Sequence, residues 1–329
     1  MNKFIYSAIA IAAASSTSMA AEGDWLQLDQ DIASLSSTVA QGGGGVDVGA
    51  LLRNSYRDGG SEGGWSQEDG DIWIEGSLEE FDWRVNVDVD SGSAVLEDAF
   101  VRWASGENIG ITWGIFRQMI ARSANIDPEN QFFIDRSLIG MHFDTFDNGI
   151  QVDGHNSGFT WALAAQNGSD GTGDSLMYTA HASYNIGNGV AMQESALKAG
   201  DELDAVIGVG YTDMEDDGND AILIVDAAIT MGQIFGTIEL ADGGDDAVLA
   251  SAGSTNPYAV AVTYLLADNL EIGYRHEDRD DDADTTKDTF GLNWLLHGQN
   301  AKWGINYIDD EAEADEVIAV NLTVGKSRR

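Results

Sequence analysis

The stretch Phe81–Asp90, which reads FDWRVNVDVD, decides the fold class of this chain. Its odd-numbered positions are aromatic or β-branched, and its even-numbered positions are arginine, asparagine or aspartate. Side chains on a β-strand point alternately to opposite faces of the sheet. The pattern therefore predicts a long strand with one apolar face and one polar face.

The same alternation continues on both sides of this stretch. It recurs in Val46–Arg57 and in Ile109–Phe116, and similar segments are found at 70–79, 94–104, 148–156, 158–167, 175–185, 203–212, 220–230, 232–241, 256–266, 269–278, 286–296, 300–309 and 316–325. Together they predict about sixteen antiparallel strands, each near the roughly 9–11 residues that a tilted transmembrane strand needs. Single-chain bacterial barrels have even strand numbers, so a further candidate at 138–145 is assigned to a connector.

The predicted connections and the aromatic residues also fit a barrel that crosses a membrane. Connections 79–80 and 267–268 are tight, whereas 58–69, 118–147, 186–202, 242–255 and 279–285 are long and polar. Aromatic residues of the apolar phase lie near strand ends: Tyr56, Phe81, Trp103, Phe159, Tyr184, Tyr211, Tyr258, Tyr264, Trp303 and Tyr307. Short turns at one end, long loops at the other and two aromatic girdles are typical of an outer-membrane β-barrel.

The first twenty residues indicate export from the cytoplasm. Lys3 precedes the apolar run Phe4–Ala14, and Ser18–Ala20 has the pattern of a signal-peptidase site. We therefore predict a signal peptide over residues 1–20, with an N-terminal core helix as the alternative. No later segment has about 18 consecutive apolar residues, the length of a membrane-spanning helix. An exported chain of this kind is periplasmic, secreted or an outer-membrane barrel, and the alternation favours the last.

Residues 21–45 precede the alternating pattern and differ from it. Apolar residues recur here at helical spacing: Trp25, Leu28, Ile32, Leu35 and Val39. The spacing predicts a short helical segment in the periplasm, although a partly ordered linker remains open. The predicted transmembrane barrel then covers 46–325, and 326–329 form a C-terminal tail.

Composition excludes several classes of function. The formal net charge of −40 excludes nucleic-acid binding, which needs basic surfaces. The absence of cysteine excludes disulfides and thiolate metal sites. The five histidines are scattered, and no catalytic motif is present, so we predict no enzyme, no catalytic residue and no resident metal.

Three acidic clusters fall in predicted loops, at 213–218, 242–246 and 278–284. The first begins like a calcium loop, but the position that needs glutamate is Ile224, so an EF-hand is excluded. Two interpretations remain: solvated loops of high charge, or outer loops that bind divalent cations bridging to lipopolysaccharide. We expect no other cofactor.

The region 96–168 contains an ordered series of motifs. They are LEDAFV at 96–101, WGIFR at 113–117, FFIDRSL at 132–138, GIQV at 149–152 and AAQNG at 164–168. In this order the series resembles the phosphate-selective porin O and P family of outer-membrane porins. The resemblance implies a sixteen-stranded barrel, a homotrimer, and a third loop, Gln118–Arg136, folded into the lumen as a constriction near 118–138. It also implies passive diffusion of small hydrophilic solutes and ions, with anions such as phosphate favoured in some members.

Two features depart from that family. Phosphate-selective members line the pore with many Arg and Lys residues, whereas this chain is acidic. Outer-membrane barrels usually end in an aromatic residue, whereas this sequence ends VGKSRR at 324–329. The physiological solute therefore stays open. Alternatives to a channel are a soluble secreted β-protein with a binding role, a barrel adhesin and a barrel enzyme.

The candidate pore-lining residues follow from the strand phase. A charge facing lipid at mid-depth costs several kcal/mol, so charged residues of the strands are expected to face the lumen. On this phase they are Arg53, Arg57, Arg84, Arg102, Asp47, Asp82, Asp88 and Asp98. Arg117, Arg122 and Arg136 fall at or within the proposed constriction loop. They form either an anion-attracting wall or ion pairs that fasten the loop to the barrel.

Overall fold

A computed structural model describes residues 45–60, 63–90, 93–106, 108–168, 175–197, 199–214, 221–244, 249, 254–313 and 315–326. Two compact units are distinguished, Met1–Val46 and Asp47–Arg329, and the barrel belongs to the second. The predicted signal peptide, the predicted N-terminal helix and residues 327–329 lie outside the described residues, so these assignments stay predictions. No helix in the described ranges has the length and apolar character needed to cross a bilayer.

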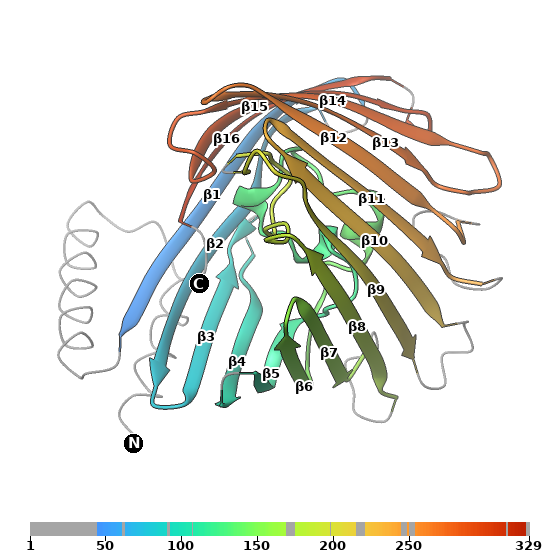
Figure 1. The fold of residues 1–329 in the computed structure, drawn as a ribbon. Helices are drawn as coiled ribbons and strands as arrows, with labels where there is room; N and C mark the ends of the chain where they lie inside the picture. Colours follow the sequence, from blue (N-terminus) through green and yellow to red (C-terminus); the bar gives the residue numbers. More distant parts are fainter. Residues whose placement is uncertain are drawn as a thin grey trace. The chain divides into compact units, whose positions relative to one another are not determined.

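The described residues contain sixteen strands that close into one antiparallel barrel (Figure 1). They are β1 (Val46–Asp58), β2 (Gly64–Leu78), β3 (Phe81–Asp88), β4 (Val95–Ser105), β5 (Ile109–Arg117), β6 (Phe146–Asn156), β7 (Phe159–Gln166), β8 (Met177–Ile186), β9 (Asp204–Met214), β10 (Ile222–Met231), β11 (Ile234–Asp242), β12 (Tyr258–Ala267), β13 (Leu270–Asp278), β14 (Thr286–Leu295), β15 (Ala301–Asp310) and β16 (Val317–Gly325). Each strand pairs with its neighbour in sequence, and β1 pairs with β16 from Leu51↔Gly325 to Asp58↔Ile318. The predicted fold class is confirmed.

The strand phase is the one that the alternation predicts. On β1, Val48 and Leu52 are exposed on the outside, whereas Arg53 and Ser55 are buried inside. On β10, Leu223, Val225 and Ile229 are outside, and Ile224, Asp226 and Thr230 are inside. An apolar outer surface around a polar inner wall follows from this alternation.

Aromatic side chains on the outer surface are brought together at strand ends by the register. Phe81 pairs with Trp103, Phe159 with Tyr184, and Trp294 with Trp303. These pairs lie next to the short turns 79–80, 157–158 and 296–300, at one mouth of the barrel. Amphipathic rings are most stable at the membrane–water interface, and this arrangement fits one of the two predicted girdles.

The connections at the two mouths differ. The mouth where β1 begins and β16 ends, called here the turn mouth, has the connections 79–80, 106–108, 157–158, 187–203, 232–233, 268–269 and 296–300. The opposite mouth, the loop mouth, has 59–63, 89–94, 118–145, 167–176, 215–221, 243–257, 279–285 and 311–316. Connection 187–203 departs from the expected division into short turns and long loops.

The structure differs from the prediction for the start of β2 and agrees with the prediction for 138–145. β2 begins at Gly64 rather than near 70, because its polar residues pair with the inner wall: Ser66 and Glu68 both hydrogen-bond to Ser55 of β1. The segment 138–145, the candidate for a seventeenth strand, contains a short helix, α3 (Leu138–His142). Its assignment to a connector is confirmed.

Candidate functional site

The candidate site is the lumen, where the β5–β6 connection folds back between the barrel walls. This connection, residues 118–145, is called the inner loop (drawn in green within the ring of strands in Figure 1). It contains two single turns of 3-10 helix, η3 (Ser123–Asn125) and η4 (Pro128–Asn130), before α3. The Ser137 hydroxyl caps α3 by accepting a 3.0 Å hydrogen bond from the Gly140 N–H. The predicted constriction loop, 118–138, is the first part of this segment.

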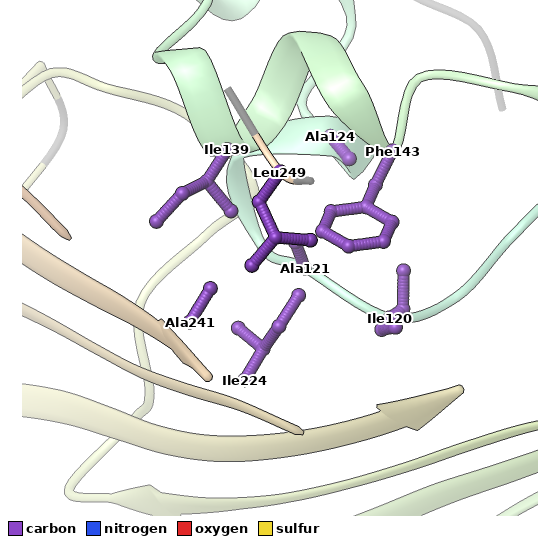
Figure 2. Close-up of a cluster of buried hydrophobic side chains, with 8 residues drawn as sticks. All are labelled: Ile120, Ala121, Ala124, Ile139, Phe143, Ile224, Ala241 and Leu249. Carbon is purple, nitrogen blue, oxygen red and sulfur yellow. The ribbon is translucent and has the colours of Figure 1, made fainter. Parts of the chain in front are cut away.

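One end of the inner loop packs into an apolar cluster on the barrel wall. Figure 2 shows its members: Ile120, Ala121, Ala124, Ile139 and Phe143 of the inner loop, Ile224 of β10, Ala241 of β11 and Leu249 of the β11–β12 connection. Ile120 and Ile224 have no exposed surface. This contact explains the aliphatic side chains of Ile224 and Ala241 on the inner wall, since burial of a large aliphatic side chain contributes about 1.5–3 kcal/mol.

A second apolar contact places Phe132 against the neighbouring strands β12–β14 of the wall. Phe132 and Phe133 cluster with Ala261 of β12. A Cβ atom added at Gly273 or at Gly291 would lie 2.6 or 2.5 Å from the Phe132 ring. The two glycines of β13 and β14 thus leave the space that the ring occupies.

Backbone groups of the inner loop find hydrogen-bond partners on the barrel wall. Asn293 donates to the Phe132 carbonyl at 2.8 Å, and the Ile134 N–H donates to Asn306 at 2.8 Å. Lys302 donates to the Glu129 carbonyl at 2.8 Å and also to the Gln131 carbonyl. Because buried backbone groups are costly without partners, these contacts hold an irregular segment inside the lumen.

Carboxylates of the wall bind the loop's N–H groups in the same way. Glu239 of β11 accepts from the Ser123 N–H at 2.7 Å, and Glu277 of β13 accepts from the Leu138 N–H at 2.6 Å. Arg275 of β13 donates to the carbonyls of Asp135 and Arg136 at 2.9 and 3.1 Å. The same guanidinium lies 4.6 Å from the centre of the Phe133 ring, a favourable cation–π distance.

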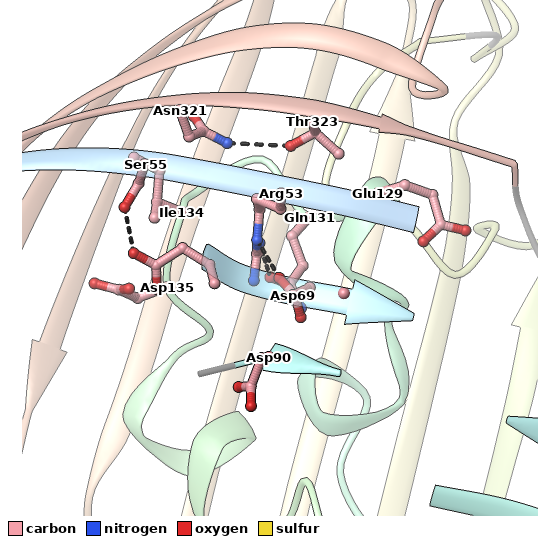
Figure 3. Close-up of polar contacts among 12 residues, drawn as sticks. Arg53, Ser55, Asp69, Asp90, Glu129, Gln131, Ile134, Asp135, Asn321 and Thr323 are labelled. Carbon is pink, nitrogen blue, oxygen red and sulfur yellow. Dashed lines mark hydrogen bonds and ion pairs between the residues drawn. The ribbon is translucent and has the colours of Figure 1, made fainter. Parts of the chain in front are cut away.

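The predicted residues Arg53 and Arg57 of β1 contact the inner loop directly. Arg53 pairs with Asp69 of β2 and donates to Gln131 at 2.9 Å, and these side chains are drawn in Figure 3. Arg57 pairs with Asp135 at 2.5 Å and with Glu68 at 3.3 Å. Both arginines therefore fasten the loop to β1 as well as lining the lumen.

Burial of Asp135 would raise the pKa of its carboxyl, but opposite charges reverse this effect. The Arg57 hydrogen bond, followed by the charges of Lys287, Arg57 and Arg275, lowers the pKa of Asp135 to about 2. Asp135 is consequently ionised throughout the physiological pH range.

The predicted loop arginines, Arg117, Arg122 and Arg136, also have partners. Arg117 pairs with Asp144 at 2.8 Å and with Asp127 at 3.7 Å. Arg136 pairs with Asp144 at 2.6 Å and donates to the carbonyls of Ser123 and Ile126. Arg122 donates to the carbonyl of Ala191 in connection 187–203. Of the two interpretations, the contacts favour ion pairs and hydrogen bonds that hold the loop.

Arg84 and Arg102 lie elsewhere, on the inner face of β3 and β4. Arg84 pairs with Glu75 at 3.0 Å and with the predicted Asp98 at 3.5 Å. Arg102 pairs with Asp153 of β6 at 2.6 Å. The exposed fraction of the Arg102 side chain is 34%, against 8% for Arg136. Arg102 is thus the more accessible charge.

The remaining predicted acidic residues lie near the mouths. Asp82 is exposed near the turn mouth and accepts from Ser77. Asp88, near the loop mouth, accepts from the N–H groups of Gly70 and Asp90. Asp47 pairs with Lys326, across the β1–β16 closure. The structure does not bring these three together with the inner loop.

The sequence patterns did not identify several residues that hold the inner loop. These residues lie on the second half of the barrel wall: Arg275, Lys302, Glu239, Glu277 and Asn293. Their inward phase was readable from the alternation. Nothing in the local sequence indicates that a loop more than a hundred positions earlier is their partner.

Of the acidic clusters, 278–284 lies within the described residues. Asp281 accepts from Thr285 at 2.9 and 2.7 Å, and Asp280 accepts from Asn256 at 3.0 Å. These carboxylates hold the loop's own turns. The described residues include no group of three or more acidic, His or Cys ligands placed for a metal ion. Residues 215–218 and 245–246 of the other two clusters lie outside the described residues, so cation binding there stays a prediction.

Comparisons with known proteins bear on the fold. No protein-family profile matches the chain, and no curated protein matches its sequence. Solved structures do match. A loop L8 deletion mutant of OmpT, an outer membrane protein of Vibrio cholerae, aligns with a TM-score of 0.60 at 12% identity, over 86% of this chain and 99% of that one. A mutant form of the Rh. blastica porin aligns with a TM-score of 0.60 at 12% identity, over 86% of this chain and 100% of that one.

At this identity the comparisons establish a shared fold. The chain has the closed antiparallel sixteen-stranded barrel that outer-membrane porins have. With its apolar outer surface and polar inner wall, such a barrel fits the outer membrane, as the alternation predicted.

Proposed function

We propose that this chain is an outer-membrane porin, a passive diffusion channel for small hydrophilic solutes and ions. The observation that carries the proposal is the inner loop, docked inside a closed barrel whose wall is polar within and apolar outside. A barrel of this size without such a loop leaves a wide aqueous lumen. A loop held within the lumen by buried contacts narrows it to a fixed, solute-sized passage.

The passage runs beside the part of the wall that the inner loop leaves uncovered. The loop docks through β1 and β10–β16, at Arg53, Ile224, Ala261, Asn293, Lys302 and Ala319 among others. Across the lumen, β3–β6 present Arg84, Arg102 and Asp153, whose side chains keep more exposure than Arg275 or Arg53. We therefore infer that β3–β6 form the permeation wall.

Purified protein in planar bilayers tests the proposal. We expect discrete open-channel steps, and liposome swelling by small sugars that falls off as the sugar becomes larger. Pure lipid and heat-unfolded protein are the controls. A correctly folded barrel, shown by compact gel migration before boiling, that gives neither current nor swelling would contradict the function.

The resemblance to phosphate-selective porins supports a finer proposal, that anions are favoured and that phosphate is one of them. The net charge of −40 opposes it only if that charge lines the passage. Arg102 is the accessible cation of the permeation wall. We expect Arg102→Ala to shift the reversal potential in a KCl gradient toward cation selectivity, and Asp153→Asn to shift it in the opposite direction. Equal reversal potentials in all three proteins would show that Arg102 does not contribute to ion selectivity.

The same resemblance supports a homotrimer embedded in lipid and lipopolysaccharide. Chemical crosslinking and light scattering in detergent test the oligomeric state, and a monomer in both would contradict it. If outer loops bind divalent cations, chelator should lower the temperature at which the barrel loses its compact gel migration. Indifference to chelator would leave these loops as solvated surface.

A further inference from the structure

The β8–β9 connection, residues 187–203, is unlike the other connections at the turn mouth. Its neighbours there, such as 157–158 and 232–233, join their strands directly. Described residues of 187–203 turn back into the barrel instead: Glu194, Ser195 and Ala196 are buried. A long connection on this side has no need to enter the lumen unless contacts there favour it.

The wall of the barrel is adapted to this segment. Val190 and Ala196 pack against Val206, Ala228 and the fully buried Phe235, on β9, β10 and β11. The Ser195 hydroxyl donates to Glu271 of β13 at 2.8 Å, and the Ala196 N–H donates to the same carboxylate at 3.1 Å. The segment is thus fixed to the inner wall by apolar and polar contacts together.

At its tip the segment meets the inner loop, which enters from the opposite mouth. The Glu194 N–H donates to the Asn130 carbonyl at 2.9 Å, and the Phe132 N–H donates to the Glu194 carboxylate at 2.9 Å. Arg122 of the inner loop donates to the Ala191 carbonyl and lies 3.3 Å from the Met192 sulfur. Two segments from opposite mouths are therefore joined inside the lumen.

We propose that 187–203 is a second constriction element, which narrows the lumen from the turn mouth and holds the inner loop through Glu194. The inference rests on the proposed channel function. Glu194 acts here as a positioning residue: it satisfies the N–H of Phe132, whose ring sits over Gly273 and Gly291. Since a buried N–H without a partner is costly, loss of this carboxylate frees the middle of the inner loop.

The chemistry of the turn mouth supports a role in permeation. A cavity of about 320 Å³ lies between the two segments and turn 296–300, and its lining includes Asn130, Gln193, His297, Gln299 and Asn300. These side chains are amides and an imidazole, in a chain with 56 acidic residues. The space beside the two joined segments therefore offers hydrogen-bonding groups without formal negative charge.

Two variants and a control test the inference on the complete chain. Glu194→Ala removes the acceptor for the Phe132 N–H, Glu194→Gln keeps an oxygen at the same distance, and Glu313→Ala makes the same truncation in the exposed β15–β16 connection. We expect frequent brief closures and open-channel noise in Glu194→Ala, and traces like those of the parent chain in Glu194→Gln and Glu313→Ala.

A further variant replaces residues 189–199 by a short Gly–Ser linker. If the segment narrows the lumen, single-channel conductance rises by about two-fold or more, because conductance follows pore cross-section. Hydrogen exchange at Phe132 should also become faster, in the replacement and in Glu194→Ala. Unchanged conductance, noise and exchange in folded barrels would overturn the inference.

The readouts separate this inference from the proposed function. If the parent chain folds but does not conduct, the proposed channel function is wrong. Hydrogen exchange at Phe132 still reports in that case whether 187–203 holds the inner loop. A parent chain that conducts, with variants indistinguishable from it, defeats the second constriction alone. If the linker replacement fails to fold, the Glu194 pair still decides.

Discussion

At the scale of single residues, the arginines described in the lumen contact carboxylates or backbone carbonyls. Arg136 is the clearest case, since it binds Asp144 and two backbone carbonyls of the inner loop. Removing one partner of a buried ion pair is more costly than replacing both partners by apolar residues, because the other charge remains buried. The predicted arginines thus differ in role according to how deeply the loop covers them.

Arg136→Ala should therefore destabilise the inner loop by about 3 kcal/mol, the lower end of the range for breaking a buried pair. We expect open-channel noise and a lower temperature of unfolding in the gel-shift assay. Arg102→Ala is the matched control, because its pair with Asp153 is more accessible to water and contributes about 1 kcal/mol. Equal stability losses in both variants would contradict this division of roles.

Asp135 makes docking of the inner loop depend on pH. Its pKa is lowered to about 2, from about 3.9 in an unfolded chain. A carboxyl of this kind stabilises the folded state fully above the unfolded pKa, and the contribution is lost as pH falls through the folded pKa. The loss of this contribution should increase channel noise as pH falls from about 4 to about 2.

Asp135→Asn provides the control for that experiment. It removes the titrating group while keeping the size of the side chain, so the variant should be noisy already at pH 7. A variant with the same acid response as the parent chain would assign that response to another carboxylate.

At the scale of elements, an irregular loop lies in the lumen because wall and loop have complementary shapes. Phe132 lies where a side chain at Gly273 or Gly291 would otherwise project. The shape of the wall thus depends on residues far from the loop in sequence. An element of this kind is held by packing rather than by its own backbone pattern.

Gly291→Ala tests this fit. The added Cβ would meet the Phe132 ring at 2.5 Å, and overpacking of a buried ring costs about 1–3 kcal/mol. We expect lower thermal stability together with altered conductance. Gly236→Ala on β11, where the nearest atom is 3.4 Å away, is the control and should behave like the parent chain. If Gly291→Ala conducts and unfolds like Gly236→Ala, the ring is not held by the wall.

The sequence predicts elements of this molecule better than it predicts their contacts. Alternation at Phe81–Asp90 and its repeats located the strands and their phase, because lipid and water impose a period of two. It missed the start of β2 at Gly64, where Ser66 and Glu68 look like loop residues until Ser55 is seen beside them. Likewise, the sequence predicts a long connection over 186–202, but the inward path of 187–203 depends on Glu271 and Asn130, which no local pattern identifies.

At the scale of the whole molecule, the outer surface determines where the barrel can reside. Large apolar side chains cover it, and Trp65 of β2 is the most exposed of those in the described residues, with 84% of its surface exposed. In water such a surface would aggregate, whereas in a bilayer it is solvated by lipid.

Arginine substitutions on the outer face of β10 measure how the cost of a charge depends on its depth in the bilayer. Val225→Arg, on the outer face and further from the loop mouth than Leu223, should cost about 2–4 kcal/mol in unfolding from lipid vesicles. Leu223→Arg, one outward position closer to that mouth, should cost less, toward about 0–1 kcal/mol. Equal costs at both positions, or none, would argue against a bilayer around this face.

The pairing of β1 with β16 carries a consequence for biogenesis. The first strand to emerge from a ribosome must wait for the last one before its second edge is satisfied, and every intermediate with fewer strands exposes two unpaired edges. Insertion should therefore be concerted rather than progressive, with Asp47 and Lys326 meeting only when the cylinder is complete. Chains truncated before β16 would depend on an assembly factor that covers their unpaired strand edges.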